Sequence, residues 1–593
     1  MNLRNFLLEV DRITGQMSKA ELEAFIHETG RLLPENKRSD YLDRLEVFLS
    51  ELPDGGTNGN SGMQKVSKQF EEECVKLQEE LSEIEEGVLC IAAEVNYKYD
   101  DWYDNDEEEF IFTDPNGVAD VVETVCEFVH KCVECEEYVY GYKIAKQLAR
   151  LRIYVENDEW DSFYDGVSIA ELELREFCSI DYKQLIIDGA YLAYCVNDME
   201  ERADAIYKMI ENSQLSDISL EMVMQNGEEL TDIVDFLPIW IEYLGKLTTW
   251  NAQKLLKEAL ELTGDAEVLL SNARQFTDLH PGLYEQYLDF IWNTEENKKI
   301  FDIGNEALEK IDVKYIVRSR IAKRLSTLAL EEQRSGGVEK YWLEAFRSET
   351  NVTNYMRIFV ESGDSRVFLE EIRRIYHRMY KKAGSSSRIY APDGELKMNN
   401  PGTETVYMLA FLGGEFQYVR EHAMNVTAAL GWSSTFMKCG LAAFLLLLLE
   451  ADKLQTAGRE MCGRIVSAVN FDKEEYQRYS NRQNDLSSAE WFWECLKKWK
   501  ESIVINDAQK QEYLQWIEQL IKKRVVGIME ANRRNYYGEC ASYIAADGEV
   551  VESRGECAAK QRVLLEYKAM YPRRSAFHGE LRKYGMYDTR RRR

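Results

Sequence analysis

Residues 295–332, EENKKIFDIGNEALEKIDVKYIVRSRIAKRLSTLALEE, contain two helical patterns with very little chain between them. The first pattern covers residues 295–310 and the second covers residues 315–332. A connection this short predicts two neighbouring helices that fold back on each other as a hairpin. The same rhythm recurs on both sides of the stretch, at residues 251–262, 266–276, 282–292, 337–348 and 353–362. One such hairpin is too small to bury its apolar face alone, so the pattern predicts an α-solenoid of stacked antiparallel helical hairpins, of the tetratricopeptide-like (TPR-like) type.

The scarcity of proline extends this prediction to the whole chain. Eight prolines occur in 593 residues, or about 1.3%, where roughly 5% is ordinary. A proline inside a helix costs about 3 kcal/mol, so a chain this poor in proline is typical of long stretches of helix. We therefore expect an all-α protein.

Breaks in the helical periodicity divide the chain into segments. A small helical module at residues 1–52 precedes a Gly/Asn/Ser-rich linker at residues 53–62. A helical-repeat array then covers residues 63–381, interrupted at residues 97–117 by an acidic and aromatic insertion that we expect to be a loop. Residues 382–404 form a second long loop, and residues 405–593 form a C-terminal helical array that ends in a basic cap.

The net charge of −32 argues against a general affinity for nucleic acid or for anionic membranes. The charge is unevenly spread, because residues 521–593 carry 17 Lys and Arg against 9 Asp and Glu. The start of the chain lacks the apolar core of an export signal, and the apolar run CGLAAFLLLLL at residues 439–449 is too short to span a bilayer. We expect that run to be a buried helix, the twelve cysteines to be reduced, and the protein to be cytoplasmic. After a capping box at residues 487–490, Trp491, Cys495 and Trp499 follow at helical spacing, which predicts a buried stripe on one helix face.

Two groups of segments resemble the helical region that follows the zinc finger in bacterial SWIM-type zinc-finger proteins. The first group is EALEKI at residues 306–311, RSRIAKRL at 318–325, EAFRS at 344–348 and TNY at 353–355. The second lies at residues 532–536, 540–541, 566–568, 571–574, 576–577 and 580–583. The resemblance implies a TPR-like scaffold. The finger itself needs a Cys-x-Cys pair, which the sequence lacks, so functions assigned through the finger do not carry over.

The sequence contains only weak evidence for metal-binding or catalytic residues. Cys126, His130, Cys132 and Cys135 form the best metal-ligand spacing, but on one unbroken helix the first two point nearly opposite to the last two. The surrounding apolar pattern favours a continuous helix, so we expect buried thiols and assign no metal and no cofactor. The six histidines are scattered, and no nucleophile elbow, Walker A or dinucleotide-binding motif is present. We therefore expect no catalytic residues and a protein that is not an enzyme.

Two surface features remain as candidate binding sites. Trp102, Tyr103 and Phe110 lie among many carboxylates in the acidic insertion and could dock a basic partner, although a solvated insertion would look the same. The C-terminal region offers seven cations that either contact nucleic acid or form a polar cap on the last repeat: Lys522, Lys523, Arg524, Arg533, Arg534, Arg573 and Arg574.

From these observations we expect a non-enzymatic protein-binding scaffold or adaptor subunit of a larger bacterial complex, which holds a protein or peptide on the solenoid surface. A nucleic-acid-associated subunit that contacts RNA or DNA through its basic C-terminal hairpin is the alternative. A membrane partner is not expected, given the acidic charge.

Overall fold

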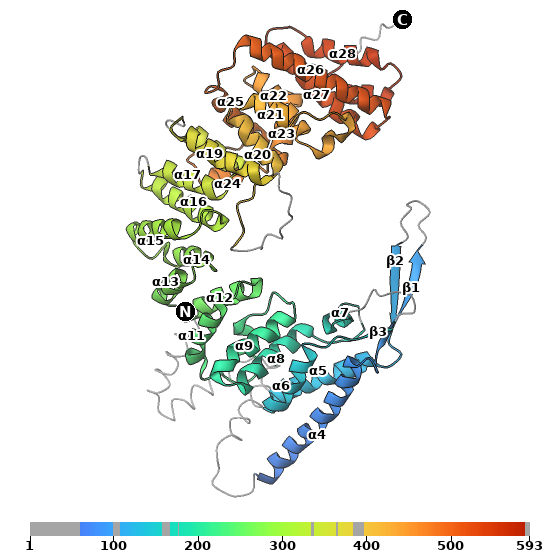
Figure 1. Cartoon of the computed structure of the whole chain (residues 1–593), viewed down its shortest axis with the longest axis vertical. Coiled ribbons are helices and arrows are strands. Elements are labelled where there is room, and N and C mark those ends of the chain that lie inside the picture. The colour runs from blue at the N-terminus through green and yellow to red at the C-terminus, as the bar shows by residue number, and fades with distance from the viewer. Residues whose placement is uncertain are drawn as a thin grey trace, which may run out of the picture. The chain divides into compact units, whose positions relative to one another are not determined.

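The computed structural model describes residues 60–98, 107–156, 166–175, 177–333, 337–362, 366–383 and 396–587. Most of these residues lie in helices, which confirms the prediction of a mainly helical protein. The chain divides into two compact units, Met1–Leu279 and His280–Arg593. Figure 1 labels the helices and strands in chain order. The predicted module at residues 1–52 and most of the predicted linker lie outside the described residues, as do residues 384–395 of the predicted long loop and the terminal arginines.

The first unit combines helices with a small sheet. Its helices are α4 (Asn60–Glu85), α5 (Val118–Glu134), α6 (Tyr138–Leu148), α7 (Ile169–Leu174), α8 (Tyr182–Val196), α9 (Met199–Asn212), α10 (Leu220–Met224), α11 (Ile233–Leu244), α12 (Trp250–Thr263) and α13 (Ala266–Gln275). Its strands are β1 (Ile91–Lys98), β2 (Glu107–Thr113) and β3 (Val155–Glu156), in the order β2-β1-β3.

Within the acidic and aromatic insertion, residues 97–98 and 107–113 form strands and not the loop that we expected. β1 and β2 pair antiparallel, with a register that runs from Ala92 opposite Thr113 to Lys98 opposite Glu107, and β1 also pairs parallel to β3. β2 ends in FIFT, a run of the aromatic and β-branched residues that favour strands, and residues 93–98 of β1, AEVNYK, alternate between apolar and polar types. That period of two is the pattern of a strand, and acidic side chains are compatible with a strand that has one face in water.

The helices of the first unit pack mainly on their neighbours in the sequence. α5 contacts α6, α6 contacts α8, α8 contacts α9, α9 contacts α11, and α11 contacts α12. Side-chain caps fix where several of them begin: Asp181 caps α8, Thr249 caps α12 and Asp265 caps α13. Helices pack closely at Gly141, where an added Cβ would lie 2.6 Å from the Cβ of Cys132 on α5.

The second unit consists almost entirely of helices in the part that the structure describes. They are α14 (Gly282–Ile291), α15 (Asn297–Lys310), α16 (Ile316–Glu331), α17 (Val338–Ser348), α18 (Val352–Glu361), α19 (Arg366–Ala383), α20 (Thr403–Leu412), α21 (Phe416–His422), η3 (Ala429–Ser434), α22 (Met437–Leu448), α23 (Thr456–Ala468), α24 (Lys473–Arg478), α25 (Ser488–Lys500), α26 (Asp507–Glu530), η4 (Arg534–Tyr536), α27 (Tyr537–Ser553), α28 (Ala559–Met570) and α29 (Ser575–Lys583).

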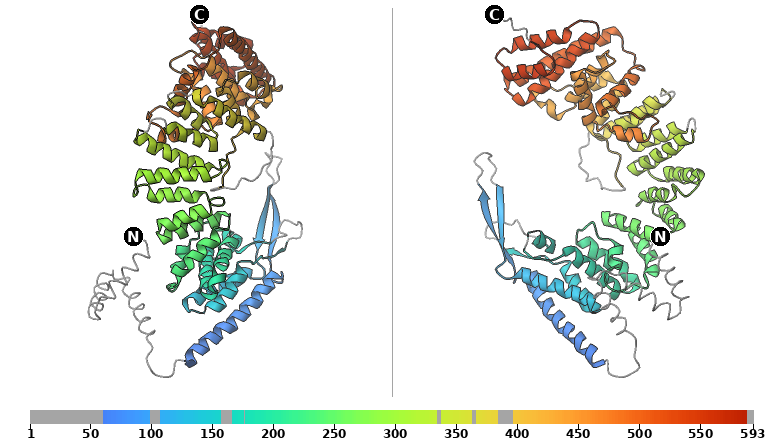
Figure 2. Two further views of the ribbon diagram at one scale, coloured as in Figure 1. Left: turned by 60° about the vertical axis from the view of Figure 1, so that its left-hand side comes forward. Right: turned by 180° about the vertical axis from the view of Figure 1, so that it is seen from behind.

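Sequence order and spatial order agree at the start of this unit and then diverge. From α14 to α18, each helix contacts the next one along the chain. α18 then also contacts α24 and α25, which lie far along the chain. Nearer the C-terminus, α27 is surrounded by α22, α23, α26, α28 and α29, and the views in Figure 2 show α26, α27 and α28 side by side.

α27 is therefore the central helix of the C-terminal part, and it buries polar groups as well as apolar ones. Every residue from Cys540 to Val550 is buried. The carboxylate of Glu549 accepts hydrogen bonds from the backbone N–H groups of Ala457 (3.2 Å) and Gly458 (2.7 Å) at the start of α23. It also forms an ion pair of 2.6 Å with Lys560 on α28. One buried carboxylate thus joins three helices.

Two predictions about the core of this part are confirmed. The apolar run at residues 439–449 lies in α22 and its C-cap residue, Leu449, and is buried throughout. Trp491, Cys495 and Trp499 form a buried stripe on α25, which begins with a capping box made by Ser487 and Glu490. Among the helices that the structure describes, none has the length and apolar character needed to cross a membrane.

Candidate functional site

The structure locates only part of the predicted acidic docking site. Phe110 lies on β2, where its backbone is the cross-strand partner of Val95 on β1. Trp102 and Tyr103 lie outside the described residues. On the same strand, Phe112 packs edge-on against Phe177 at 6.3 Å, and the guanidinium of Arg175 lies 4.1 Å from its ring centroid. Phe112, one of the aromatic side chains of this segment, therefore packs within the first unit.

Arg524, one of the seven predicted cations, is not on the surface. Its side chain is fully buried, forms an ion pair of 2.7 Å with Glu539, and donates a hydrogen bond to the carbonyl oxygen of Ala429. The rings of Trp432 and Tyr536 lie 5.6 Å and 5.1 Å from its guanidinium carbon. A guanidinium enclosed in this way is not accessible to a phosphate, so the prediction of a nucleic-acid contact is wrong for this residue.

The other six cations remain at or near the surface, in two places. Lys522 and Lys523 are exposed along α26, and Lys523 approaches the carbonyl oxygen of Val426 at 3.5 Å. The four arginines lie in two turns. Arg533 and Arg534 belong to the turn between α26 and α27, and Arg573 and Arg574 belong to the turn between α28 and α29.

The weak metal-ligand spacing lies on α5, which is continuous as we predicted. Cys126, His130 and Cys132 are within this helix and Cys135 is its C-cap residue. Nδ1 of His130 lies 2.9 Å from Oδ2 of Asp188 on α8. Among the described residues, no group of three His, Cys, Asp or Glu side chains is arranged to hold a metal ion.

Asp188 is itself part of a compact polar cluster. It is buried, and its second oxygen, Oδ1, accepts hydrogen bonds from the side-chain amides of Gln184 (2.8 Å) and Asn226 (2.9 Å). Burial raises the pKa of the neighbouring Cys126 thiol to about 12, with Cys178 and Asp188 adding to the effect. A thiol with that pKa is protonated at neutral pH and is a poor nucleophile. The cluster therefore joins α5, α8 and the segment after α10, and it does not activate the cysteine.

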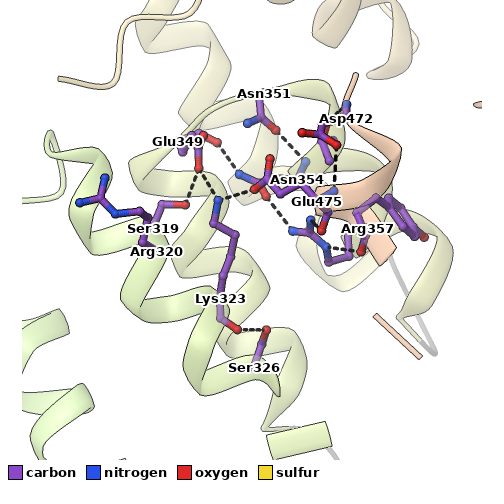
Figure 3. A network of polar contacts seen from close by, with 12 residues as sticks. Ser319, Arg320, Lys323, Ser326, Glu349, Asn351, Asn354, Arg357, Asp472 and Glu475 are labelled. Carbon is purple, nitrogen blue, oxygen red and sulfur yellow. Dashed lines mark hydrogen bonds and ion pairs between the residues drawn. The ribbon is translucent and has the colours of Figure 1, made fainter. Parts of the chain in front are cut away.

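A larger buried network joins helices of the second unit (Figure 3). Lys323 on α16 is buried, and its ammonium group lies 2.8 Å from Oε2 of Glu349, the residue that follows α17. The same ammonium group forms a second ion pair, with Glu475 on α24. Glu349 also accepts a hydrogen bond from Ser319 at 2.8 Å. Burial raises the pKa of Glu349, but the charge and hydrogen bond of Lys323 outweigh this effect and hold the pKa below its usual value.

Arg357 on α18 completes this network. Its guanidinium donates to Oδ1 of Asn354 (2.7 Å) and to the carbonyl oxygens of Glu475 (3.1 Å) and Tyr476 (3.4 Å). The side chain is fully buried, and burial lowers the pKa of the guanidinium.

The network holds two cations, Lys323 and Arg357, and two carboxylates, Glu349 and Glu475, so its charges balance. Buried ion pairs that are fully hydrogen-bonded fix the geometry of the elements that carry them. This network therefore attaches α24 to α16 and α18, although Arg357 and Glu475 lie 118 residues apart in the sequence.

Asp547 on α27 is a buried carboxyl of a different kind. It is only 6% exposed, and its Oδ1 has no hydrogen-bond partner among the described residues. Burial, with a contribution from the negative charge of Glu518 on α26, raises the pKa of Asp547 to about 8. Tyr567 faces it from α28, and burial raises the pKa of that phenol as well. The carboxyl is therefore mostly protonated at neutral pH, which is how an acid tolerates such a site.

An open groove in the first unit is the strongest candidate for binding a partner. It lies between α6 and α9 and has a volume of about 360 Å³. Tyr142, Lys146 and Arg150 line it from the side of α6. The side of α9 contributes Asn197, Glu200, Glu201, Asp204, Ala205, Lys208, Met209 and Asn212.

The two sides of this groove differ in charge. Lys146 and Arg150 are exposed, and neither forms an ion pair with a residue that the structure describes. Glu200 and Glu201 are also exposed, and neither forms an ion pair with a residue that the structure describes. Asp204 is engaged by Lys208 (2.6 Å) and by the hydroxyl of Tyr243 (2.9 Å). The groove thus offers positive groups on one side and negative groups on the other.

No motif singles out the residues that line this groove. Tyr142, Lys146 and Arg150 are four residues apart, as are Asn197, Glu201 and Ala205, but polar residues at that spacing occur on any solvated helix face. The groove exists because α6 and α9 both pack near α8. Predicting the groove would have required the helix-spacing pattern together with the packing of α6 and α9 on α8.

No known protein-family model matches the chain, and a search of the curated proteins found no match.

Proposed function

We propose that the chain is a non-enzymatic protein-binding scaffold or adaptor subunit, built on α-solenoid stretches of the TPR-like type. Two stretches support this proposal, α5 to α12 and α14 to α18, because their helices pack mainly on neighbours in sequence. Such stacking creates continuous surfaces with grooves between adjacent helices. From the sequence pattern alone, we also propose kinship with the helical region of bacterial SWIM-type zinc-finger proteins.

The observation that carries the proposal is the groove between α6 and α9. Its volume of about 360 Å³ lies in the range of a few hundred Å³ that is typical of binding sites. Its lining is mostly polar, with unpaired charges of both signs on opposite sides. An extended peptide fits this arrangement, with an acidic residue against Lys146 and Arg150 and a basic residue against Glu200 and Glu201.

The absence of a catalytic role is part of the same proposal. The most prominent buried polar networks in the described part of the chain, around Lys323 and around Asp188, hold side chains in fixed pairs. Burial raises the thiol pKa of Cys126 and Cys132 to about 12. These groups are arranged for packing, whereas catalytic acids, bases and nucleophiles need pKa values near the working pH.

The test is a selection of peptides that bind the whole chain, followed by calorimetry with charge-reversed variants. Lys146→Glu combined with Arg150→Glu should weaken a selected peptide by about tenfold or more, because the acidic residue of the peptide would then face like charge. Lys143→Glu combined with Arg152→Glu is the matched control, since both residues are exposed and neither lines the groove. Equal loss in the two variants, or no selectable peptide, would refute the groove as the binding site.

A further inference from the structure

The structure brings together two arginine-rich turns that lie about forty residues apart in the sequence. One follows α26 and contains Arg533 and Arg534, and the other follows α28 and contains Arg573 and Arg574. The guanidinium of Arg574 donates to Oδ1 of Asn532 and to the carbonyl oxygen of Met529, the latter at 2.9 Å. Both acceptors belong to the end of α26 or to the turn after it, so the two turns lie against each other.

Apolar contacts beneath the turns hold this arrangement in place. Phe577 on α29 is fully buried and packs edge-on against Tyr537 at 5.6 Å and against Tyr571 at 6.1 Å. Tyr537 begins α27, and Tyr571 follows α28. The arginine pairs therefore stand on a packed base at one end of the α26 to α29 helices.

Three of the four arginines present free charge. Arg533, Arg534 and Arg573 are exposed, and none forms an ion pair or side-chain hydrogen bond with a residue that the structure describes. Glu530, also exposed, is the carboxylate at the end of α26. With Arg574 half-buried and fixed by its two hydrogen bonds, this end of the unit carries a local excess of positive charge on a protein whose net charge is −32.

We propose that this four-arginine surface binds single-stranded nucleic acid. Each of the three free guanidinium groups can form paired hydrogen bonds with a phosphate, and three of them on adjacent turns, beside the fixed charge of Arg574, exceed what one isolated phosphate can use. A nucleic-acid strand, which carries several successive phosphates, can pair with all of these guanidinium groups. Tyr571 is half-exposed between the arginine turns and Phe577, so it supplies an aromatic ring on which an unpaired base can stack.

The acidic remainder of the protein limits the site to this surface. Long-range repulsion is screened over about 8 Å at physiological salt, so local contacts decide whether binding occurs. The same repulsion disfavours additional contacts elsewhere along the strand. The bound segment is therefore short, about four nucleotides or slightly more, with weak affinity and a strong dependence on salt.

The experiment is fluorescence anisotropy of labelled oligo(U) and oligo(dT), roughly 12 nucleotides long, titrated with the whole chain between about 50 and 200 mM salt. Phosphate contacts by the three free arginines predict a slope of about −2.1 in log K against log salt, because each contact contributes about 0.7 on a single strand. Arg533→Ala with Arg573→Ala should reduce the slope to about −0.7 and weaken binding about tenfold or more at low salt.

The matched control is Arg554→Ala with Arg562→Ala. It removes the same charge from the opposite end of α27 and α28 and should change the affinity by less than about twofold. Arg533→Lys with Arg573→Lys should keep the slope and lose part of the affinity, because the paired geometry is lost while the charge stays.

Three results would overturn the proposal: no salt-dependent binding by the unmodified chain, equal loss in the control, or competition by inorganic polyphosphate as strong as by oligonucleotide. The last result would assign the surface to simple anions. Circular dichroism of each variant shows whether it has kept its fold. If the alanine variant unfolds, the Arg→Lys variant tests the proposal, and an unchanged affinity in it would refute guanidinium recognition.

Discussion

Replacing Asp547 by asparagine should stabilise the C-terminal part of the protein at neutral pH. The carboxyl is buried on α27 with one oxygen unpartnered among the described residues, Glu518 faces it from α26 and Tyr567 from α28, and its pKa is raised from 3.8 to about 8. Below about pH 4 the group is protonated in both folded and unfolded chains and has no effect on their balance. Between about pH 4 and 8 only the unfolded chain releases the proton, so stability falls as pH rises.

The size of this effect follows from the pKa difference. One pKa unit corresponds to 1.36 kcal/mol, so at pH 7 the ionisable group lowers the free energy of unfolding by up to about 4 kcal/mol. At pH 5 the same arithmetic gives no more than about 2 kcal/mol. Asparagine has nearly the same shape and does not ionise, so Asp547→Asn should remove the pH-dependent loss. Relaxation around the buried charge makes these values upper limits.

The assay is urea unfolding with pulsed hydrogen exchange of the α27 amides, at about pH 5 and pH 7. The gain from Asp547→Asn should be larger at the higher pH. Asp485→Asn, at an exposed position outside this contact, controls for the general loss of a negative charge and should show no such change. A gain of equal size at both pH values, or a loss, would refute the assignment of Asp547 as a buried protonated acid.

Three other substitutions test the packing. Lys323→Met should lower the free energy of unfolding of the second unit by about 3 to 5 kcal/mol, because Glu349 and Glu475 would lose their shared cation. Changing Glu349 and Glu475 to Gln in the same chain should restore most of the lost stability in urea titrations. A variant that regains no stability would contradict the network. Gly141→Ala should lower the melting temperature of the first unit, at a cost of about 1 to 3 kcal/mol, because its new Cβ would lie 2.6 Å from the Cβ of Cys132; an unchanged melting temperature would argue against the α5–α6 contact. Glu549→Gln should cost about 1 to 3 kcal/mol and speed amide exchange in the first turn of α23, which its carboxylate caps; unchanged exchange there would contradict the cap.

Local patterns were enough to predict most of the helices. The apolar run in α22 and the stripe of Trp491, Cys495 and Trp499 depend only on spacing along one helix, and both are buried as predicted. The β1–β2 hairpin was not predicted because the acidic residues at 97–117 were judged only for their fit to an amphipathic helix and not for their fit to a strand. The aromatic and β-branched run FIFT at residues 110–113, together with the alternation at residues 93–98, was the signal for strands.

Surface predictions failed where distant parts of the chain decide exposure. Arg524 belongs to a run of three basic residues, and nothing next to it in the sequence distinguishes it from Lys522 and Lys523. It is buried because Glu539 and the carbonyl of Ala429 reach it from other elements. The groove between α6 and α9 escaped prediction for the same reason, since it arises from the packing of two helices around a third.

The attachment of α24 to α16 and α18 has a consequence for the order in which the protein can be made. During synthesis, Lys323 and Arg357 leave the ribosome more than a hundred residues before Glu475, whose carboxylate pairs with Lys323 and whose backbone carbonyl accepts a hydrogen bond from Arg357. Until then Lys323 has Glu349 as its one carboxylate partner in the network and Arg357 lacks its carbonyl acceptors on α24, and closing the site restricts a long loop of chain. A fragment ending in the predicted loop at residues 382–404 would keep that site open permanently. The useful boundary for expressing a shorter second unit therefore lies after Tyr479, whose carbonyl receives the indole N–H of Trp342.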